Sequence, residues 1–312
     1  MTVSSYSTLG LHLASSIALP ELAPLAPEKQ NQDADIRIEQ GSIPETLPEA
    51  SFRNPIHQTI GATQHLMSFP NIARMLISNG THIVIDPLTG GDETDVLQDW
   101  RSILLGSGLT SLCFQRGWLA MHASAVLLPG RTTATLLLGH ATAGKSTLAA
   151  ALTQRGAHLI SDDLSPLEQT REGFVVKPVG RGIKLHPTSF EGLSLSQDGA
   201  LPVRKTEKTK LLYFPERSHP TACLLGDCLI LEEARSTRPS GEDRYVGATA
   251  FAHLSNNVHR RRAASAMGLR GQIFAQTVAL AEQVPVTALR LPKQFPALIA
   301  IADRLIAEAR DP

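Results

Sequence analysis

The segment from Thr135 to Thr147 constrains the fold more than any other part of the chain. It reads Thr-Leu-Leu-Leu-Gly-His-Ala-Thr-Ala-Gly-Lys-Ser-Thr, a short apolar strand, then a glycine-bounded loop, then the start of a helix. Residues Gly139–Ser146 fit G-x-x-x-x-G-K-[ST], the pattern of the phosphate-binding loop (P-loop). Glycine-containing turns also match it by accident. Here the strand before the loop and an apolar helical stripe after it, ended by Gly156, favour a real nucleotide site.

The residue types in this loop suit a nucleotide carried with Mg²⁺. Gly139 and Gly144 supply backbone conformations that a Cβ would hinder, so that main-chain N–H groups turn inward toward an anion. Lys145 brings a mobile charge to the terminal phosphates, and the Ser146 hydroxyl can complete a magnesium shell. The helix that opens near Ser146 points its positive end at the same phosphates. We expect nucleotide contacts from Gly139, His140, Ala141, Thr142, Ala143, Gly144, Lys145, Ser146 and Thr147.

A pair of carboxylates follows the next predicted strand. Ala157–Ile160 is short and apolar, and Ser161-Asp162-Asp163 comes directly after it. In an α/β sheet, chemistry collects at the carboxyl ends of strands, so an acid that holds a metal and an acid that acts as a base are expected here. Adjacent side chains on a strand point to opposite faces and need not share a role. The alternative is a helix cap or a solvated turn, which also favours Asp.

Composition and charge exclude several classes of protein. A chain of 312 residues can bury a large core, and its length suggests two domains. Lys plus Arg (29) equals Asp plus Glu (29), so no global field attracts nucleic acid or an anionic membrane. Any attraction for an anion must therefore be local, and we expect neither nucleic acid nor a membrane as a partner.

Targeting signals and cysteine usage indicate a cytoplasmic protein. No Lys or Arg precedes Lys29, so the basic region of a secretory signal is missing, and no apolar run approaches membrane-spanning length. The three cysteines, Cys113, Cys223 and Cys228, are an odd number without metal-type spacing. They are expected to be core thiols in a reducing compartment.

Residues 1–108 read as a smaller N-terminal α+β domain. Strands are expected between Ser5 and Leu22 and from Asp35, and Gly41–Pro55 is expected to be mostly loop. Asn79-Gly80 between two apolar runs is a strong hairpin signal. Asp92–Gly106 has helical spacing, with a junction near Gly108. No catalytic constellation stands out, so this domain is expected to brace the core or present substrate.

Residues 109–312 read as the P-loop-containing α/β domain. We expect a helix over Leu109–Arg116, one strand over Leu119–Leu128 that carries His122, and an apolar strand over Cys223–Leu231. The remaining predictions are a loop at Gly241–Arg244, one long helix from His259 with Phe274 among its buried residues, a strand over Val284–Leu291 and a final helix over Phe295–Arg310.

Three basic segments have two interpretations each. Lys177–Pro187 either lines the mouth of the site or is a solvated connection. Ser194–Lys210 is either a mobile lid or a solvated basic loop. The arginines of His259–Arg262 either reach a phosphate or begin a solvated helix.

Three motifs together resemble the catalytic core of the HPr kinase/phosphorylase family. They are Met121-His-Ala-Ser-Ala-Val126, the P-loop, and Arg155-Gly-Ala-His-Leu-Ile-Ser-Asp-Asp163. The closer resemblance is to HPr-kinase-like proteins associated with lasso-peptide biosynthesis, in which His-Ala-Ser-Ala-Val follows a Gln-Arg-Gly like that of Gln115–Gly117. Members of that group phosphorylate the C-terminal serine of a precursor peptide. The resemblance implies an HPr-kinase-like catalytic domain that uses ATP and Mg²⁺.

The resemblance also implies roles for particular residues. Asp162 would be the general base for a substrate hydroxyl, Asp163 would help Ser146 to hold Mg²⁺, and His122 would lie beside the transferring phosphoryl group. His158 receives no role, because the family's histidine position is Ala157 in this chain. The family's downstream signature contains an acid that is absent from Val179-Gly-Arg-Gly-Ile183, which leaves ATP-dependent transfer without phosphate removal. Members are oligomeric, so the resemblance implies a possible homo-oligomer.

Three functions follow as hypotheses. The first is a serine kinase that acts on a peptide or small protein, most plausibly a lasso-peptide precursor. The second is a kinase of the same fold that acts on a phosphocarrier protein or a small-molecule hydroxyl. The third is a nucleotide-binding regulatory module without transfer activity. Phosphoryl transfer requires mainly positioning and charge neutralisation, which loop amides, Lys145, Mg²⁺ and a base within reach of the acceptor would supply.

Overall fold

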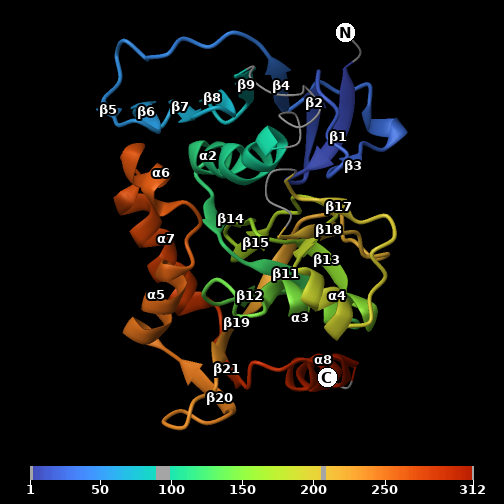
Figure 1. Ribbon diagram of the computed structural model, residues 1–312. Helices are drawn as coiled ribbons and strands as arrows, with labels where there is room; N and C mark the ends of the chain where they lie inside the picture. The colour runs from blue at the N-terminus through green and yellow to red at the C-terminus, as the bar shows by residue number, and fades with distance from the viewer. Residues whose placement is uncertain (1–2, 89–98, 205–208, 311–312) are drawn as a thin grey trace.

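Figure 1 shows a mixed α/β architecture built on two large sheets. The computed structural model describes residues 3–88, 99–204 and 209–310. The first sheet lies at the top of the view, the second lies below it, and helices run down one side. This arrangement agrees with the α/β class expected from the P-loop segment.

The N-terminal sheet has nine strands in the order β3-β1-β2-β4-β9-β8-β7-β6-β5. The strands are β1 Ser4–Thr8, β2 Leu11–Ser15, β3 Ala23–Pro24, β4 Ile36–Gln40, β5 Phe52–Arg53, β6 His57–Ile60, β7 Gln64–Phe69, β8 Ala73–Ser78 and β9 His82–Pro87. A short 3₁₀ helix covers Pro27–Lys29. The predicted Asn79-Gly80 hairpin is confirmed, since β8 and β9 pair antiparallel across it.

The predicted end of a helix near Gly106–Gly108 is wrong. Residues 99–103 are α-helical, Leu104–Gly108 forms one π-helical turn, and α2 (Leu109–Gln115) continues without a loop. A Cβ on Gly108 would lie 3.2 Å from Leu104 Cδ1 and 3.5 Å from the sulfur of Met75. Gly108 therefore allows close packing against the first sheet. Residues 89–98, which hold the start of the predicted helix, lie outside the described residues.

The second sheet carries the P-loop strand at its centre. Its order is β10-β14-β15-β19-β12-β11-β13, and β21 and β20 continue from β19. Its strands are β10 Leu119–Met121, β11 Ser124–Leu127, β12 Ala134–Leu138, β13 His158–Ser161, β14 Ser165–Gln169, β15 Phe174–Val176, β19 Cys223–Glu233, β20 Gly241–Tyr245 and β21 Val286–Leu291. A separate small sheet contains β16 Ile183–Leu185, β17 Leu201–Pro202 and β18 Leu211–Tyr213.

Two predictions for this part of the chain are corrected. Gly241–Arg244, expected to be a loop, belongs to β20, because its backbone pairs with β21 despite its exposed polar side chains. The long helix expected from His259 is interrupted at Gly268, whose φ is +77°. The helices after the P-loop are α3 Lys145–Gln154, α4 Pro187–Gly192, α5 Gly247–Asn256, α6 Arg261–Ala266, α7 Arg270–Gln283 and α8 Phe295–Arg310.

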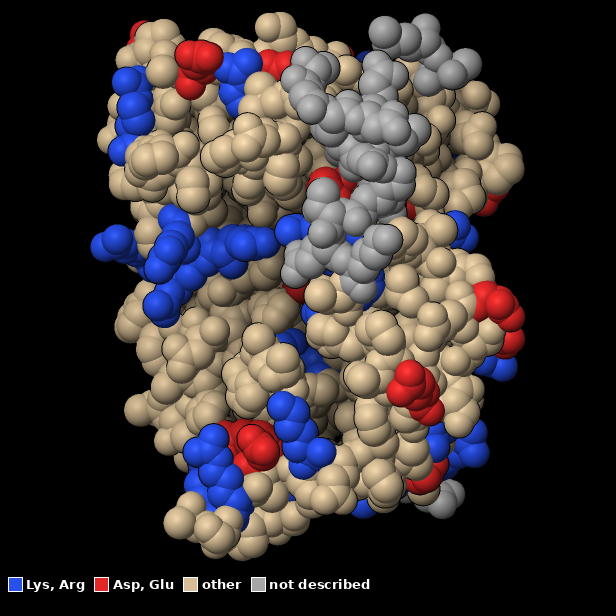
Figure 2. All heavy atoms as spheres, viewed as in Figure 1, with Lys and Arg blue, Asp and Glu red and all other residues tan. Residues whose placement is uncertain are grey.

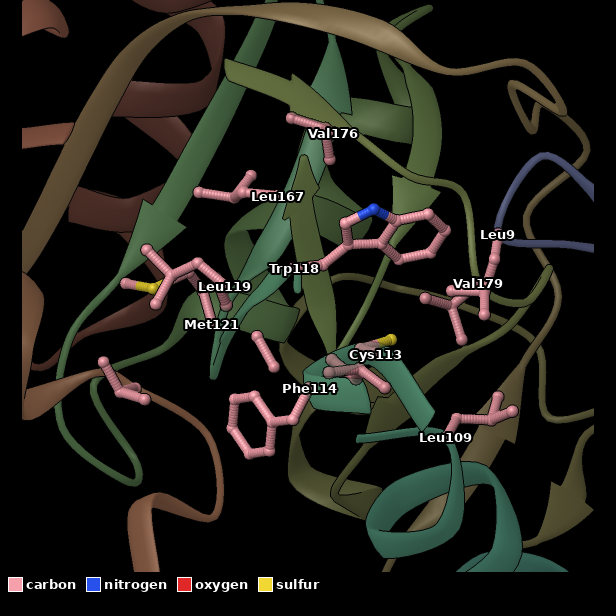
Figure 3. Packing of buried hydrophobic residues seen from close by; sticks show 14 of the residues in the cluster. Leu9, Leu109, Cys113, Phe114, Trp118, Leu119, Met121, Leu167, Val176 and Val179 are labelled. Atoms are coloured by element: carbon pink, nitrogen blue, oxygen red, sulfur yellow. The ribbon is translucent and has the colours of Figure 1, made fainter. Parts of the chain in front are cut away.

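One buried cluster joins the two large sheets. It contains Leu9 and Met75 from the first sheet region together with Trp118 and Met121 from the second. Figure 3 shows Trp118 close to Val179 and Leu9, with Cys113 and Phe114 of α2 beneath it. The division into domains at residue 108 stays a prediction; residues on both sides of it share this core. The three cysteines are buried and unpaired, as expected.

Surface charge and helix length are the two properties relevant to the expectation that the partners include neither nucleic acid nor a membrane. Figure 2 shows Lys and Arg side chains gathered in a row across the left half of this face, although the formal net charge is zero. The positive charge is therefore locally concentrated. Among the described residues, the helices are all too short or too polar to cross a bilayer.

Two neighbouring residues of α7 test its orientation. Ile273 is 7% exposed and packs in the main core, whereas Phe274, predicted to be buried, is 59% exposed and contacts Phe251. Ile273→Ala is expected to lower the free energy of unfolding by about 2–5 kcal/mol, because it leaves a cavity. Phe274→Ala should lower it by less than about 1 kcal/mol. Urea denaturation measures both; equal losses would contradict this orientation of α7.

Candidate functional site

The P-loop joins β12 to α3 in a conformation that requires its glycines. Gly139 has φ +140°, and a Cβ on it would lie 2.7 Å from the carbonyl oxygen of Leu231 at the end of β19. Gly144 has φ +97° and directly precedes α3. The N–H of Gly139 donates to Oδ1 of Asn257 at 3.1 Å. The first N–H groups of α3 have no partner within the helix, so they are available to an anion.

Lys145 folds across its own loop. The side chain is buried, and Nζ donates to the carbonyl oxygens of Gly139 at 2.8 Å and His140 at 3.2 Å. Burial lowers the pKa of Lys145, and the carboxylates of Asp162 and Asp163 oppose this shift. The ammonium is thus held within the loop, with backbone carbonyls as its partners.

The carboxyl ends of four strands meet at the P-loop. Strand β11 is antiparallel to both β12 and β13, and β19 is parallel to both β12 and β21, so β12, β13, β19 and β21 run the same way. At this edge lies a cavity of about 600 Å³, within the ordinary range for small-molecule sites. Of the predicted site residues, His122, Asp162, Asp163 and His140–Thr147 line this cavity.

Asp162 is the hydrogen-bond centre of the site. Its Oδ1 accepts from the hydroxyls of Ser124 at 2.5 Å and Ser146 at 2.9 Å, and its Oδ2 accepts from the backbone N–H of Lys184 at 2.9 Å. Burial raises the pKa of Asp162, and the nearby charge of Asp163 also raises it, while the three hydrogen bonds act in the opposite direction. Asp162 is therefore the more basic of the two carboxylates.

Asp163 has the opposite electrostatic environment. Its backbone has φ +69°, and Oδ2 accepts from Nζ of Lys184 at 2.7 Å. Oδ1 lies 3.2 Å from Nδ1 of His122. Burial opposes ionisation of Asp163, but Lys184, His122 and His259 together hold the pKa of Asp163 well below its usual range. Asp163 therefore stays anionic at neutral pH.

His122 lies where the predicted strand is broken. The single strand expected over Leu119–Leu128 is two strands, because β10 pairs with β14 whereas β11 pairs with β12 and β13. His122 and Ala123 lie between them. The N–H of His122 donates to the carbonyl of Asn257 at 2.7 Å, and its ring stacks on His259 with centroids 5.6 Å apart.

The predicted magnesium pair is not hydrogen-bonded together in this structure. The hydroxyl of Ser146 donates to Asp162, while Asp163 pairs with Lys184 and His122. All of these side chains line the same cavity. Their oxygen atoms are the donors that Mg²⁺ prefers, so the site fits a magnesium ion that keeps several waters.

Five residues in or beside the cavity were not singled out from the sequence. They are Ser124, Lys184, Glu232, Asn257 and His259. Ser124 lies in the quoted His-Ala-Ser-Ala-Val motif, and Lys184 lies in the Lys177–Pro187 segment, so both had a local signal. Asn257 and His259 had none, because the turn between α5 and α6 reaches the site only through tertiary packing.

The three basic segments named in the sequence analysis differ in whether their residues line the cavity. Lys184 and His186 of the Lys177–Pro187 segment line the cavity, as does Lys210. Residues 205–208 of the predicted lid lie outside the described residues. Within the part of the chain that the structure describes, Arg260–Arg262 are not among the residues that line the cavity.

Part of the cavity lining is apolar. It is formed by side chains at the ends of β19 and β21 and on the first turns of α8. These residues are Leu231, Leu291, Pro292, Phe295 and Leu298. Leu298 adjoins the P-loop, since a Cβ on Gly144 would lie 3.3 Å from its Cδ1. The same segments also contribute Glu232, Glu233 and Lys293 to the lining, so apolar and charged side chains lie next to one another there.

The two aspartates should affect stability in opposite directions. The folded-state pKa of Asp163 is depressed, so its ionised form stabilises the fold above the unfolded pKa of about 3.9, and this contribution is lost as pH falls through the folded pKa. The folded-state pKa of Asp162 is raised, so ionisation costs stability as pH rises through it. At pH 7, Asp163→Asn should lower the free energy of unfolding, and Asp162→Asn should raise it.

Urea denaturation of both variants and the parent between pH 3 and pH 7 measures these effects. The deficit of Asp163→Asn should shrink toward pH 3, and so should the gain of Asp162→Asn. Two variants that change stability in the same direction at pH 7 would contradict these environments.

Comparison with known proteins finds likenesses among solved structures alone. No family model matches the chain, and no curated protein matches it in sequence. A solved structure of the Hpr(Ser) kinase/phosphatase from Coxiella burnetii is similar with a TM-score of 0.30 and 13% identity, over 61% of this chain and 98% of that chain. At this TM-score and identity, the activity of that protein is not transferred to this chain.

Proposed function

We propose that this protein is an ATP-dependent kinase that transfers a phosphoryl group to a hydroxyl of a peptide or small protein. The observation that supports this proposal is the geometry of one cavity. A P-loop with Lys145 and Ser146 lines it together with two carboxylates that have opposite pKa shifts, Asp162 and Asp163. Phosphoryl transfer needs these groups for positioning and charge neutralisation.

The nucleotide would lie along the cavity. Its phosphates would take the place beside the loop amides and α3 that Lys145 Nζ now approaches, and the ammonium would exchange its carbonyl partners for phosphate oxygens. The adenine would lie against the apolar side chains of Phe295 and Leu298. A volume of about 600 Å³ is sufficient for a ligand of this size.

The proposed magnesium ion would be held by Ser146 and Asp163, and it would neutralise phosphate charge when bound. The low pKa of Asp163 keeps this carboxylate charged at neutral pH. Lys184 adds a fixed positive charge on the same side of the cavity. His122 would lie beside the transferring group, with its backbone held by Asn257.

Asp162 would accept the proton of the acceptor hydroxyl. Its raised pKa makes it a stronger base than an ordinary aspartate, which suits general-base catalysis near neutral pH. Its two Oδ1 partners are hydroxyls, Ser124 and Ser146. An acceptor hydroxyl could replace the Ser146 bond when Ser146 turns to the metal.

The proposed acceptor is the C-terminal serine of a lasso-peptide precursor, as the motif resemblance implies. A C-terminal serine carries a carboxylate next to its hydroxyl. Lys210 and His186 line the cavity and could bind such a carboxylate. A possible homo-oligomeric state stays a prediction.

Asp162→Asn tests the catalytic role. The variant should bind ATP with an affinity close to that of the parent and should transfer phosphate about 10²–10⁴-fold more slowly, because a positioned base is lost. Asp198→Asn, an exposed acid outside the cavity, is the matched control. Nucleotide affinity by calorimetry and transfer from labelled ATP are the measurements. Transfer at the parent rate would show that Asp162 is not the base.

The acceptor is tested with peptides. A peptide ending in serine should gain one phosphate group in mass spectrometry, whereas the same peptide ending in alanine should not. A C-terminal amide should react more slowly than the free acid if the carboxylate is bound. Phosphate transfer only to a small alcohol or a carrier protein would overturn the peptide assignment. Nucleotide binding without transfer to any acceptor would favour a regulatory module.

A further inference from the structure

Three side chains from distant segments converge beside the P-loop. His122 comes from the break between β10 and β11, Asp163 follows β13, and His259 lies in the turn between α5 and α6. Each offers one ligand atom, and these atoms all lie within 4.8 Å of one another. His259 is 7% exposed. The proposed kinase mechanism leaves His259 without a role.

Hydrogen bonds define the tautomer of His259. The Thr110 hydroxyl donates its single proton to the carbonyl of Gly106 at 2.6 Å. The 2.6 Å contact between Thr110 Oγ1 and His259 Nδ1 therefore requires Nδ1–H to be the donor. Nε2 then carries a lone pair. Among the described residues, nothing forms a hydrogen bond with this atom.

His122 is in the same tautomer. Its Nδ1 lies 3.0 Å from the backbone oxygen of Asp163, which can only accept. Nδ1 is therefore protonated, and the lone pair is on Nε2, which likewise has no hydrogen-bond partner in the described part of the chain. The two rings are stacked with an interplanar angle of 21°. Both rings therefore carry a lone pair on Nε2, and the ring of His122 lies beside the Asp163 carboxylate through its Nδ1.

We propose that His122, Asp163 and His259 form a binding site for a divalent transition-metal ion such as Zn²⁺. Two imidazole nitrogens and one carboxylate oxygen are a common ligand set for such ions, and three protein ligands leave a position open to water or substrate. Mg²⁺ prefers oxygen donors, so this site differs in its nitrogen ligands from the magnesium site proposed to accompany ATP, although the two sites share Asp163.

Neighbouring residues form hydrogen bonds with the three proposed ligands, and such bonds fix the orientation of metal-binding side chains. Thr110 holds the far nitrogen of His259, and the Asp163 carbonyl holds that of His122. Lys184 binds Oδ2 of Asp163, so an ion would take Oδ1, which now lies 3.2 Å from Nδ1 of His122. A tetrahedral ion with bonds of about 2.1 Å has donors about 3.5 Å apart, so the side chains would draw inward by about 1 Å.

The site has a consequence that rests on the proposed kinase function. Because His122 and Asp163 line the cavity of the P-loop, an ion held by them would place positive charge beside the phosphoryl group during transfer. It would also join the α5–α6 turn to the two segments on either side of the P-loop.

Metal titration without nucleotide tests this proposal separately from kinase activity. Chelator-treated protein is titrated with Co²⁺, followed by visible absorption, and with Zn²⁺, followed by calorimetry. The parent should bind one equivalent. His259→Gln and His122→Gln should each weaken binding at least about 100-fold, and Thr110→Val should weaken it about 10–100-fold. His186→Gln, which removes a cavity histidine outside the cluster, should leave the affinity for metal unchanged.

The outcomes separate the two proposals. Absence of Co²⁺ and Zn²⁺ binding, or equal binding by parent and His259→Gln, would overturn the metal site even if Mg²⁺-dependent transfer is observed. Binding of one equivalent of metal by the parent, and its loss in His259→Gln and His122→Gln, would support the site even if no phosphate transfer is found. Circular dichroism checks that each variant is folded. If His259→Gln is unfolded, the metal affinities of His122→Gln and His186→Gln are compared instead, and equal affinities would overturn the site.

Discussion

The parallel pairing of β12 with β19 is the constraint on which the rest of the site depends. Every side chain of β12 is buried, and Cys228, Leu229 and Ile230 of β19 lie opposite its last three residues. The pairing brings the Leu231 carbonyl so close to Gly139 that any side chain there would clash. The start of the P-loop is therefore shaped by the neighbouring strand as well as by its own sequence.

The two adjacent aspartates at this edge of the sheet differ in pKa because their surroundings differ. Asp162 is surrounded by hydroxyls and a backbone N–H, and its pKa is raised, whereas Asp163, the next residue, pairs with Lys184 and His122, and its pKa is lowered. Two adjacent acids thus differ in basicity because their surroundings differ. The positive φ of Asp163 turns the chain directly after β13, which helps to give the two carboxylates different partners.

Much of the architecture could be predicted from local patterns. The P-loop, its strand and helix, the Asn79-Gly80 hairpin and the terminal strand and helix all carry short-range signals. The errors have a common cause. The exposed backbone of β20, the continuous helix through Gly106 and Gly108, and the break at His122 depend on pairing or packing with distant segments. Gln115 and Arg116, noted as part of a family motif, bind the backbone of Gly80 at the hairpin turn.

The sequence by itself determined the glycine-bounded loop between a strand and a helix, the lysine and serine within it and the acid pair after the next strand, because glycine conformation and strand–loop–helix order are local properties. Only the tertiary structure decided which partners those acids have and which remote residues complete the site. Asn257 and His259 lie more than 100 residues after the P-loop strand begins, yet they contact Gly139 and stack on His122. Contacts of this kind depend on the packing of the α5–α6 turn, which no nearby residue specifies.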